Sequence, residues 1–245
     1  MHEPQLNLWN PGMQGPAIYE HTQGNFHAVR ALLRRKRRAI TFYRTPTYIE
    51  TSNVFLKSYW DLAPEYFPNI KVFHLIRHPL EVARSTANRE KYLCDQRKYR
   101  YYRGRDGRQY RWWALTGLEP IFGSFDLSQL TLFQFHLIQW IEIENRAMEY
   151  LRRFNMHTRC LTLHAPQDLN CAATAAKILD FVGIADSGGL SMPGVQNRTP
   201  GYETSVGNDE LIQSRDIVSA LPTAYLEVFQ HEPCASQPWA ALLTQ

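Results

Sequence analysis

The stretch KVFHLIRHPLEVARS, residues 71–85, decides the fold. After Lys71, residues 72–76 form a nearly continuous apolar run that only His74 interrupts, which is typical of a strand buried on both faces of a parallel sheet. Pro79 is favoured in the first turn of a helix, and we expect that helix to run to about Tyr92. The stretch therefore predicts a buried strand that leads directly into a helix.

Other segments of the chain alternate between the same two kinds of secondary structure. Short apolar runs predict further strands at 39–43 and 159–163. Apolar residues at helical spacing predict helices at 27–38, 51–67, 128–154 and 172–182. The segment 210–226 is expected to be mostly helical, with an interruption at Pro222. Ser128 is the expected N-cap of the longest helix. Strands that alternate with helices are typical of an α/β fold with a parallel sheet.

Length and composition favour a single domain over residues 1–245. The net charge of +4 suits an anionic ligand without identifying one. No run of 18 apolar residues is present, which predicts no membrane span, and the polar N-terminus does not resemble a signal peptide. The four cysteines are widely spaced, which argues against a zinc site and favours reduced thiols. We therefore expect a cytoplasmic protein without a metal.

Two cationic stretches call for an interpretation. The run at 34–38 lies at the expected end of a helix, where positive charge is favourable, and we prefer this explanation to a nucleic-acid patch. Residues 94–125 interleave tyrosine and tryptophan with arginine, and 97–111 contain seven cations against Asp106 alone. We interpret 94–125 as an inserted loop or lid outside the core that covers an acceptor site. An interface is the alternative.

The junction after the strand at 71–76 has the chemistry of a phosphate site. Arg77 follows the strand directly, and ligands of open α/β sheets bind at the carboxyl ends of strands. The next helix begins at once, so its N–H groups and partial positive charge face the same place. Ser85, two turns into that helix, adds a hydroxyl donor. The alternative is a surface arginine and a small packing residue, and geometry alone favours neither.

The same residues resemble the 3′-phosphate motif of the PAPS-dependent sulfotransferases. That motif is a strand followed by Arg, then Asn or Asp, then Pro, with Ser eight residues after the Arg. Arg77, Pro79 and Ser85 match it, whereas His78 departs from the usual Asn or Asp. The resemblance implies a three-layer α/β/α fold with a parallel central sheet, similar to P-loop NTPases. It also implies transfer of a sulfo group from PAPS to the hydroxyl of a glycan, lipid or secondary metabolite, with PAP as product and no metal.

Weaker similarities follow the same order along the chain. The sequence RTPTY at 44–48 resembles the Lys-Ser-Pro-x-Tyr stretch of the heparan-type members, which implies that Arg44 places positive charge near the sulfo group. Residues 181–184 resemble the Phe-Leu-Gly ending of a later helix in the family. Arg198 and Gly201 resemble the loop that covers the nucleotide, with an ordinary turn as the alternative.

The loop that holds the 5′-phosphosulfate in this family has no counterpart before Arg44. We therefore expect the chain to start downstream of that loop, to lack the first strand of the sheet and to be inactive by itself. The resemblance then implies Glu3 as the general base and His2 as the second candidate, and a disordered N-terminus is the alternative. Two other functions stay open. One is a non-catalytic remnant that still binds PAP; the other is a protein that binds an anionic polymer, RNA or glycan, although nucleic acid is the less expected partner.

Overall fold

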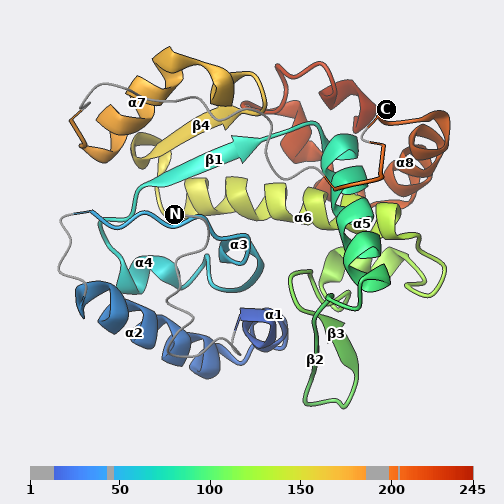
Figure 1. The fold of residues 1–245 in the computed structure, drawn as a ribbon, viewed down its shortest axis with the longest axis horizontal. Helices are drawn as coiled ribbons and strands as arrows, with labels where there is room; N and C mark the ends of the chain where they lie inside the picture. Colours follow the sequence, from blue (N-terminus) through green and yellow to red (C-terminus); the bar gives the residue numbers. More distant parts are fainter. Residues whose placement is uncertain (1–13, 43–46, 186–198, 204, 245) are drawn as a thin grey trace. The chain divides into compact units, whose positions relative to one another are not determined.

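The structure is a computed structural model, and it describes residues 14–42, 47–185, 199–203 and 205–244 (Figure 1). Contacts divide the chain into two compact units. The first contains Met1–Ile70 and Lys98–Gly123, and the second contains Lys71–Arg97 and Ser124–Gln245. Each unit therefore joins segments that are far apart in the sequence.

The second unit is built on a small parallel sheet, which confirms the mixed α/β class. Strand β1 (Val72–Ile76) pairs with β4 (Cys160–His164), so that Val72 lies opposite Cys160 and Ile76 opposite His164. Over the described residues this sheet has two strands. Both strands lie within one residue of their predicted bounds. The expected burial of β1 on both faces is wrong for Leu75, which is 52% exposed.

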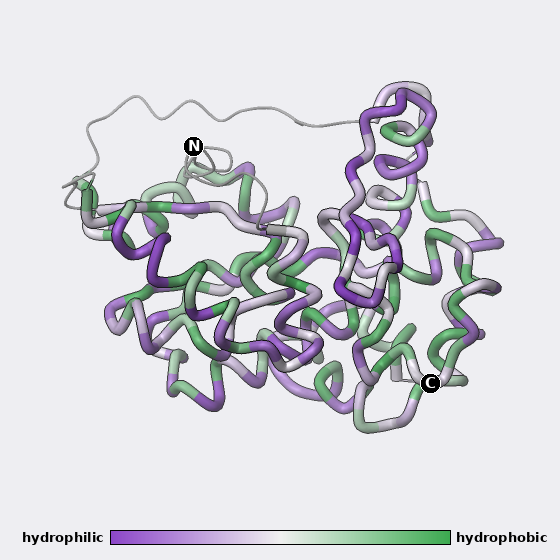
Figure 2. The backbone as a smooth tube through the Cα atoms, turned by 90° about the horizontal axis from the view of Figure 1, so that it is seen from below, coloured by the Kyte–Doolittle hydropathy of each residue, from purple (hydrophilic) through white to green (hydrophobic). Residues whose placement is uncertain are grey.

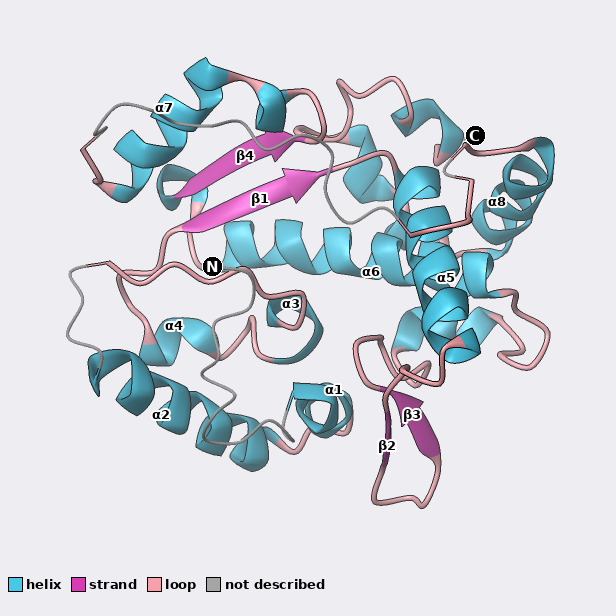
Figure 3. Cartoon of the chain, in the orientation of Figure 1, coloured by secondary structure: helices cyan, strands magenta, loops and turns pink. Residues whose placement is uncertain are grey.

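Helices pack against opposite faces of β1 (Figures 1 and 3). Neighbouring residues of a strand point to opposite sides. Phe73 contacts Phe181 of α7 (Ala172–Val182) with a ring separation of 5.3 Å. His74, the next residue, contacts Glu144 of α6 (Leu132–Arg153). The sheet therefore has α7 on one side and α6 on the other.

Two buried hydrogen bonds attach α6 to its neighbours. His74 Nε2 lies 2.9 Å from Glu144 Oε2, and the two side chains are 8% and 5% exposed. His136 Nε2 lies 3.0 Å from Oε2 of Glu90 in α5 (Pro79–Asp95), and both side chains are almost fully buried. Buried polar groups need such partners, because an unpaired one loses its hydration without compensation. These two pairs fix both β1 and α5 to α6.

Helix α6 begins at a cap that the sequence analysis placed three residues too early. Thr131 is the N-cap, and its hydroxyl accepts the N–H of Gln134 at 3.2 Å. The Gln134 side chain accepts the Thr131 N–H at 3.0 Å, which completes a capping box. Ser128 instead donates its N–H to Asp126 in the preceding turn. At Ser128 no capping box can form, because the residue three positions later is Thr131, whose side chain is too short to accept the N–H of Ser128.

In the C-terminal part of the second unit, α7 has its predicted bounds, whereas the helix expected at 210–226 begins at Asn208 and ends at Ala220. Helix α7 ends at Gly183, which has a φ of 76° and so adopts the left-handed conformation that favours glycine. Helix α8 (Asn208–Ala220) ends two residues before Pro222, which cannot continue a helix. Short 3-10 helices complete this unit at His157–Arg159, Asp168–Asn170, Thr223–Tyr225, Glu227–Gln230 and Ala240–Leu242.

The first unit contains most of the differences from the predicted elements. Residues 39–42, expected in a strand, form the last turn of α2 (Phe26–Phe42). Val29 and Leu33 are buried in this helix, and the half-buried Ile40 continues the same face seven residues after Leu33. The low helix propensity of Ile and Thr, a few tenths of a kcal/mol, does not outweigh that packing.

The helix expected at 51–67 is two short helices, α3 (Phe55–Ser58) and α4 (Ala63–Tyr66). Pro64 lies in the first turn of α4, where its missing N–H costs nothing. The same proline inside one continuous helix would remove a hydrogen bond and clash with the preceding turn. The interruption is therefore a local consequence of the sequence.

The segment 94–125 is more ordered than a loop. It contains the hairpin β2 (Tyr101–Arg103) and β3 (Gln109–Arg111), followed by a 3-10 helix at Pro120–Ser124 (Figure 3). Tyr102 and Tyr110 stack at 5.7 Å, and Tyr110 lies 5.1 Å from Tyr19 of α1 (Gln14–Thr22). All three rings are buried, so the expectation that none of this segment belongs to a core is wrong for both hairpin tyrosines. Its use as a lid stays a prediction.

Hydrophilic and hydrophobic segments are mixed along the coloured part of the tube in Figure 2. Within the described ranges, no helix combines the length and the apolar character needed to cross a membrane.

The buried pair on α6 generates a test of stability. We expect Glu144→Ala to lower the free energy of unfolding by about 2–4 kcal/mol, because it removes a buried hydrogen-bond partner of His74 and leaves a cavity. Glu149→Ala, on the same helix but in an exposed pair with Arg152, should change it by less than about 0.5 kcal/mol. Urea unfolding followed by circular dichroism measures both. Equal effects would show that the buried pair contributes nothing specific.

Candidate functional site

The candidate site lies where β1 ends and α5 begins. Ile76 is the last residue of β1, and its carbonyl accepts the N–H of Ala165 at 2.8 Å. Ala165 directly follows β4, so this bond continues the pairing of the two strands by one residue. Arg77 follows at the carboxyl edge of the sheet, and its side chain is 43% exposed. The structure thus places a cation where open α/β sheets bind ligands.

His78 is the N-cap of α5. Its Nδ1 accepts the N–H of Leu80 at 3.2 Å, and its backbone is extended, with φ −48° and ψ 120°. This is the task that Asn or Asp performs at many helix starts. Burial lowers the pKa of His78 below its usual 6.5, and the nearby Arg77 lowers it further, against an opposing effect of Glu81. In the neutral ring, the Nδ1 lone pair stays free to accept the hydrogen bond from the N–H of Leu80.

Arg77 forms an ion pair within its own segment. Its Nε and Nη2 donate to Glu81 Oε2 at 3.2 and 3.1 Å, and both side chains are about 40% exposed. Exposed pairs four residues apart contribute only about 0.3–0.5 kcal/mol. A dianion that offers two oxygens to the guanidinium can therefore displace this carboxylate at small cost.

Ser85 lies four residues after Glu81 and so on the same face of α5. The side chain is half-buried. Its neighbour Arg84 forms an ion pair with Glu210, and Glu210 also accepts the N–H of Gly207 at 2.8 Å at the start of α8. The Nε of Arg84 is buried and has no hydrogen-bond partner over the described residues. The sequence did not single out Arg84, because its partner Glu210 lies in a helix far along the chain.

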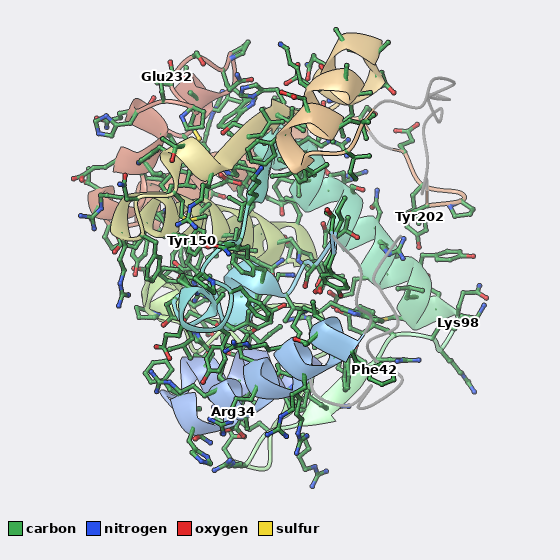
Figure 4. The ribbon with its side chains drawn as sticks, turned by 90° about the vertical axis from the view of Figure 1, so that its left-hand side faces the viewer. Arg34, Phe42, Lys98, Tyr150, Tyr202 and Glu232 are labelled. Atoms are coloured by element: carbon green, nitrogen blue, oxygen red, sulfur yellow. The ribbon has the colours of Figure 1, made fainter. Side chains whose placement is uncertain are left out.

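A late segment of the chain runs along α5. Asn88 Nδ2 donates to the carbonyl of Glu203 at 2.9 Å, and the Tyr202 hydroxyl donates to Asp95 at 3.2 Å. Lys91 Nζ lies 6.0 Å from the centre of the Tyr202 ring. Figure 4 shows Tyr202 beside this helix. The residues that follow the expected covering loop are therefore attached to the helix that carries Ser85.

The structure brings together some of the predicted site residues and does not describe others. Arg77 and Ser85 both belong to the β1–α5 region. His2, Glu3, Arg44 and Arg198 lie outside the described residues. In the part of the chain that is described, no group of three His, Cys, Asp or Glu side chains is placed to hold a metal ion.

Comparison of the chain with protein-family models, with curated proteins and with solved structures gives no match. The interpretation of the site therefore rests on its residues and their geometry.

The cap at His78 predicts a pH dependence. In the unfolded chain His78 protonates near its ordinary pKa of about 6.5, and in the folded protein it protonates only at lower pH. The unfolded state thus binds more protons between these two values, and stability should fall as the pH drops below about 6.5. His78→Asn supplies an uncharged acceptor instead. Between pH 7.5 and 5.5, the free energy of unfolding should fall by about 0.5 kcal/mol less in the variant than in the wild type. The difference is small because water screens the half-buried ring.

Urea unfolding at the two pH values measures this difference. The other histidines are common to both proteins, so their effects cancel. An identical pH dependence for the two proteins would show that His78 does not cap α5 through its neutral ring.

Proposed function

We propose that the protein is a PAPS-dependent sulfotransferase. It transfers the sulfo group of PAPS to the hydroxyl of a glycan, lipid or secondary metabolite and releases PAP, without a metal. The observation that carries this proposal is the junction at Arg77, where a parallel strand, an exposed guanidinium and a capped helix start meet with Ser85 on the first turns. We also propose the cytoplasm as its location.

The 3′-phosphate of the nucleotide binds at this junction. Its oxygens replace the Glu81 carboxylate on Arg77, and the positive end of α5 favours the dianion. The Ser85 hydroxyl donates a further hydrogen bond from the Glu81 face of the helix. Arg84, with its unpartnered Nε and its partly exposed side chain, raises the local positive potential. The cradle is thus made of two cations, one hydroxyl and one helix terminus.

The proposed fold is the three-layer α/β/α fold of these enzymes, with a P-loop-like parallel sheet. The observations that support it are the parallel pairing of β1 and β4, and the placement of α6 and α7 on opposite faces of β1. The segment at 199–203, bonded to α5 through Asn88, fits a loop that covers the nucleotide, with Arg198 directly before it.

The chemistry of transfer needs groups outside this cradle. As the acceptor oxygen bonds to sulfur, the bond from sulfur to the phosphate oxygen of PAPS breaks, and the hydroxyl proton passes to a base. We assign the base to Glu3, with His2 as the second candidate. Arg44 stabilises the charge that develops near the sulfo group.

A second candidate function is binding of PAP without transfer. The described groups of the candidate site, Arg77 and Ser85, serve binding of the 3′-phosphate, and this observation favours it. Both functions use the same 3′-phosphate cradle. They differ in one measurable respect: only the enzyme releases PAP from PAPS when an acceptor is present.

Titration calorimetry with PAP tests the cradle. We expect Arg77→Gln to weaken binding by about 10- to 100-fold, since a charge-assisted phosphate contact contributes about 1.5–3 kcal/mol. Glu81→Gln should tighten binding about twofold, because it removes the carboxylate that competes for Arg77. Ser85→Ala should weaken it by about tenfold or less.

Arg89→Gln is the matched control, because Arg89 is exposed on the same helix and the substitution removes the same charge. Its affinity should equal that of the wild type. Absence of PAP binding by folded wild-type protein, or equal losses for Arg77→Gln and Arg89→Gln, contradicts the proposed site. PAP binding without release of PAP from PAPS selects the second candidate.

A further inference from the structure

The two units of the chain carry opposite net charges. The first unit contains 14 Lys and Arg residues against 7 Asp and Glu residues, a net charge of +7. The second contains 13 against 16, a net charge of −3. The overall charge of +4 therefore hides a strongly basic unit, which is the electrostatic character of proteins that bind polyanions.

The described acidic residues of the first unit already have partners there. The pairs are Glu20 with Arg105, Glu50 with Lys36, Asp61 with His21, Glu65 with Arg30, Asp106 with Tyr110, and Glu119 with Thr22. These described carboxylates are thus already engaged with other groups of the unit.

Three cations of this excess lie on one face of α2. Arg34, Arg37 and Arg38 are exposed, and spacings of three and four residues place them side by side. None of the three forms an ion pair within the described residues. Because α2 continues to Phe42, these arginines lie before its last turn, so the favourable charge of a helix C-terminus does not explain them.

The same face borders an open hollow of about 650 Å³. Its lining residues come from α2 and from the end of α4, and they are Arg34, Arg37, Arg38, Thr41, Phe42 and Tyr66. The Phe42 ring is 79% exposed, an unusual position for a large apolar side chain. Figure 4 labels Arg34 and Phe42 on this helix. Guanidinium groups and aromatic rings therefore share one open surface.

We propose that this surface binds single-stranded nucleic acid. Arginines on successive turns, about 5–6 Å apart, contact phosphates along the backbone, and guanidinium forks suit phosphate oxygens. The Phe42 and Tyr66 rings offer faces on which bases stack. An open hollow admits a strand that passes through it, whereas a buried pocket admits only a free end.

Other anionic partners fit these observations less well. A membrane surface would need an exposed apolar helix face, but Val29 and Leu33 of α2 are buried within the unit. A sulfated glycan would satisfy the arginines, yet it has no planar base to stack on the exposed Phe42. The charges alone suit any polyanion, and the aromatic rings favour nucleic acid.

Fluorescence anisotropy with labelled U12 and dT12, titrated with the full chain at several salt concentrations, tests the proposal. Replacing all three arginines (Arg34→Gln, Arg37→Gln, Arg38→Gln) should weaken binding at least tenfold at low salt. It should also make the slope of log K against log salt less negative by about 2, since each phosphate contact on a single strand contributes about 0.7. Phe42→Ala should weaken binding about fivefold or more at unchanged slope. The two oligonucleotides distinguish RNA from DNA as the preferred strand.

The matched control removes the same charge from the second unit with Arg89→Gln, Lys177→Gln and Arg215→Gln, all at exposed positions. It should bind like the wild type. Equal losses for the two triple variants, or full affinity of Phe42→Ala, would overturn the proposal. Binding to heparin or to phosphatidylserine vesicles that depends on Arg34, Arg37 and Arg38, without oligonucleotide binding, would overturn it as well. These variants leave Arg77 intact, so PAP titrations remain independent.

Discussion

The hydrogen bond between His74 and Glu144 is the constraint on which the second unit depends. It joins the middle of β1 to α6 through two buried side chains, three residues before Arg77. The bond between His136 and Glu90 does the same for α5. Each pair must stay together, because separating the partners would leave a buried polar group unpaired. Strand β1 and helix α5 are thus both held by the same long helix.

This shared attachment explains how a short segment can form a preorganised site. The residues 77–79 connect two elements that α6 fixes in place, so the helix terminus and the arginine need little reordering when an anion binds. The bonds that must break are weak and exposed, above all the one between Arg77 and Glu81. Helix α6 thus keeps the backbone around Arg77 in place, while the exposed ion pair between Arg77 and Glu81 can open for a phosphate.

The two cationic surfaces of the chain differ in how their charge is balanced. In the second unit, Arg77 and Arg84 have carboxylate partners, and the helix terminus adds to their effect. In the first unit, Arg34, Arg37 and Arg38 of α2 have no carboxylate partner over the described residues and lie beside an exposed Phe42. The first arrangement suits one phosphate dianion in a defined position. The second suits a chain of phosphates with flat groups between them.

The sequence by itself determined the elements whose signals are local. The apolar run at 71–76, Pro79 at a helix start and the helical spacing at 172–182 each act within a few residues, and all three elements are confirmed. It also located Arg77 and Ser85 on one strand–helix junction. Tertiary structure alone decided that residues 39–42 stay helical, that Tyr102 and Tyr110 are buried, and that Arg84 pairs with Glu210. Those outcomes depend on contacts between segments far apart in the chain, and the free energy of such packing exceeds the local preferences that a sequence displays.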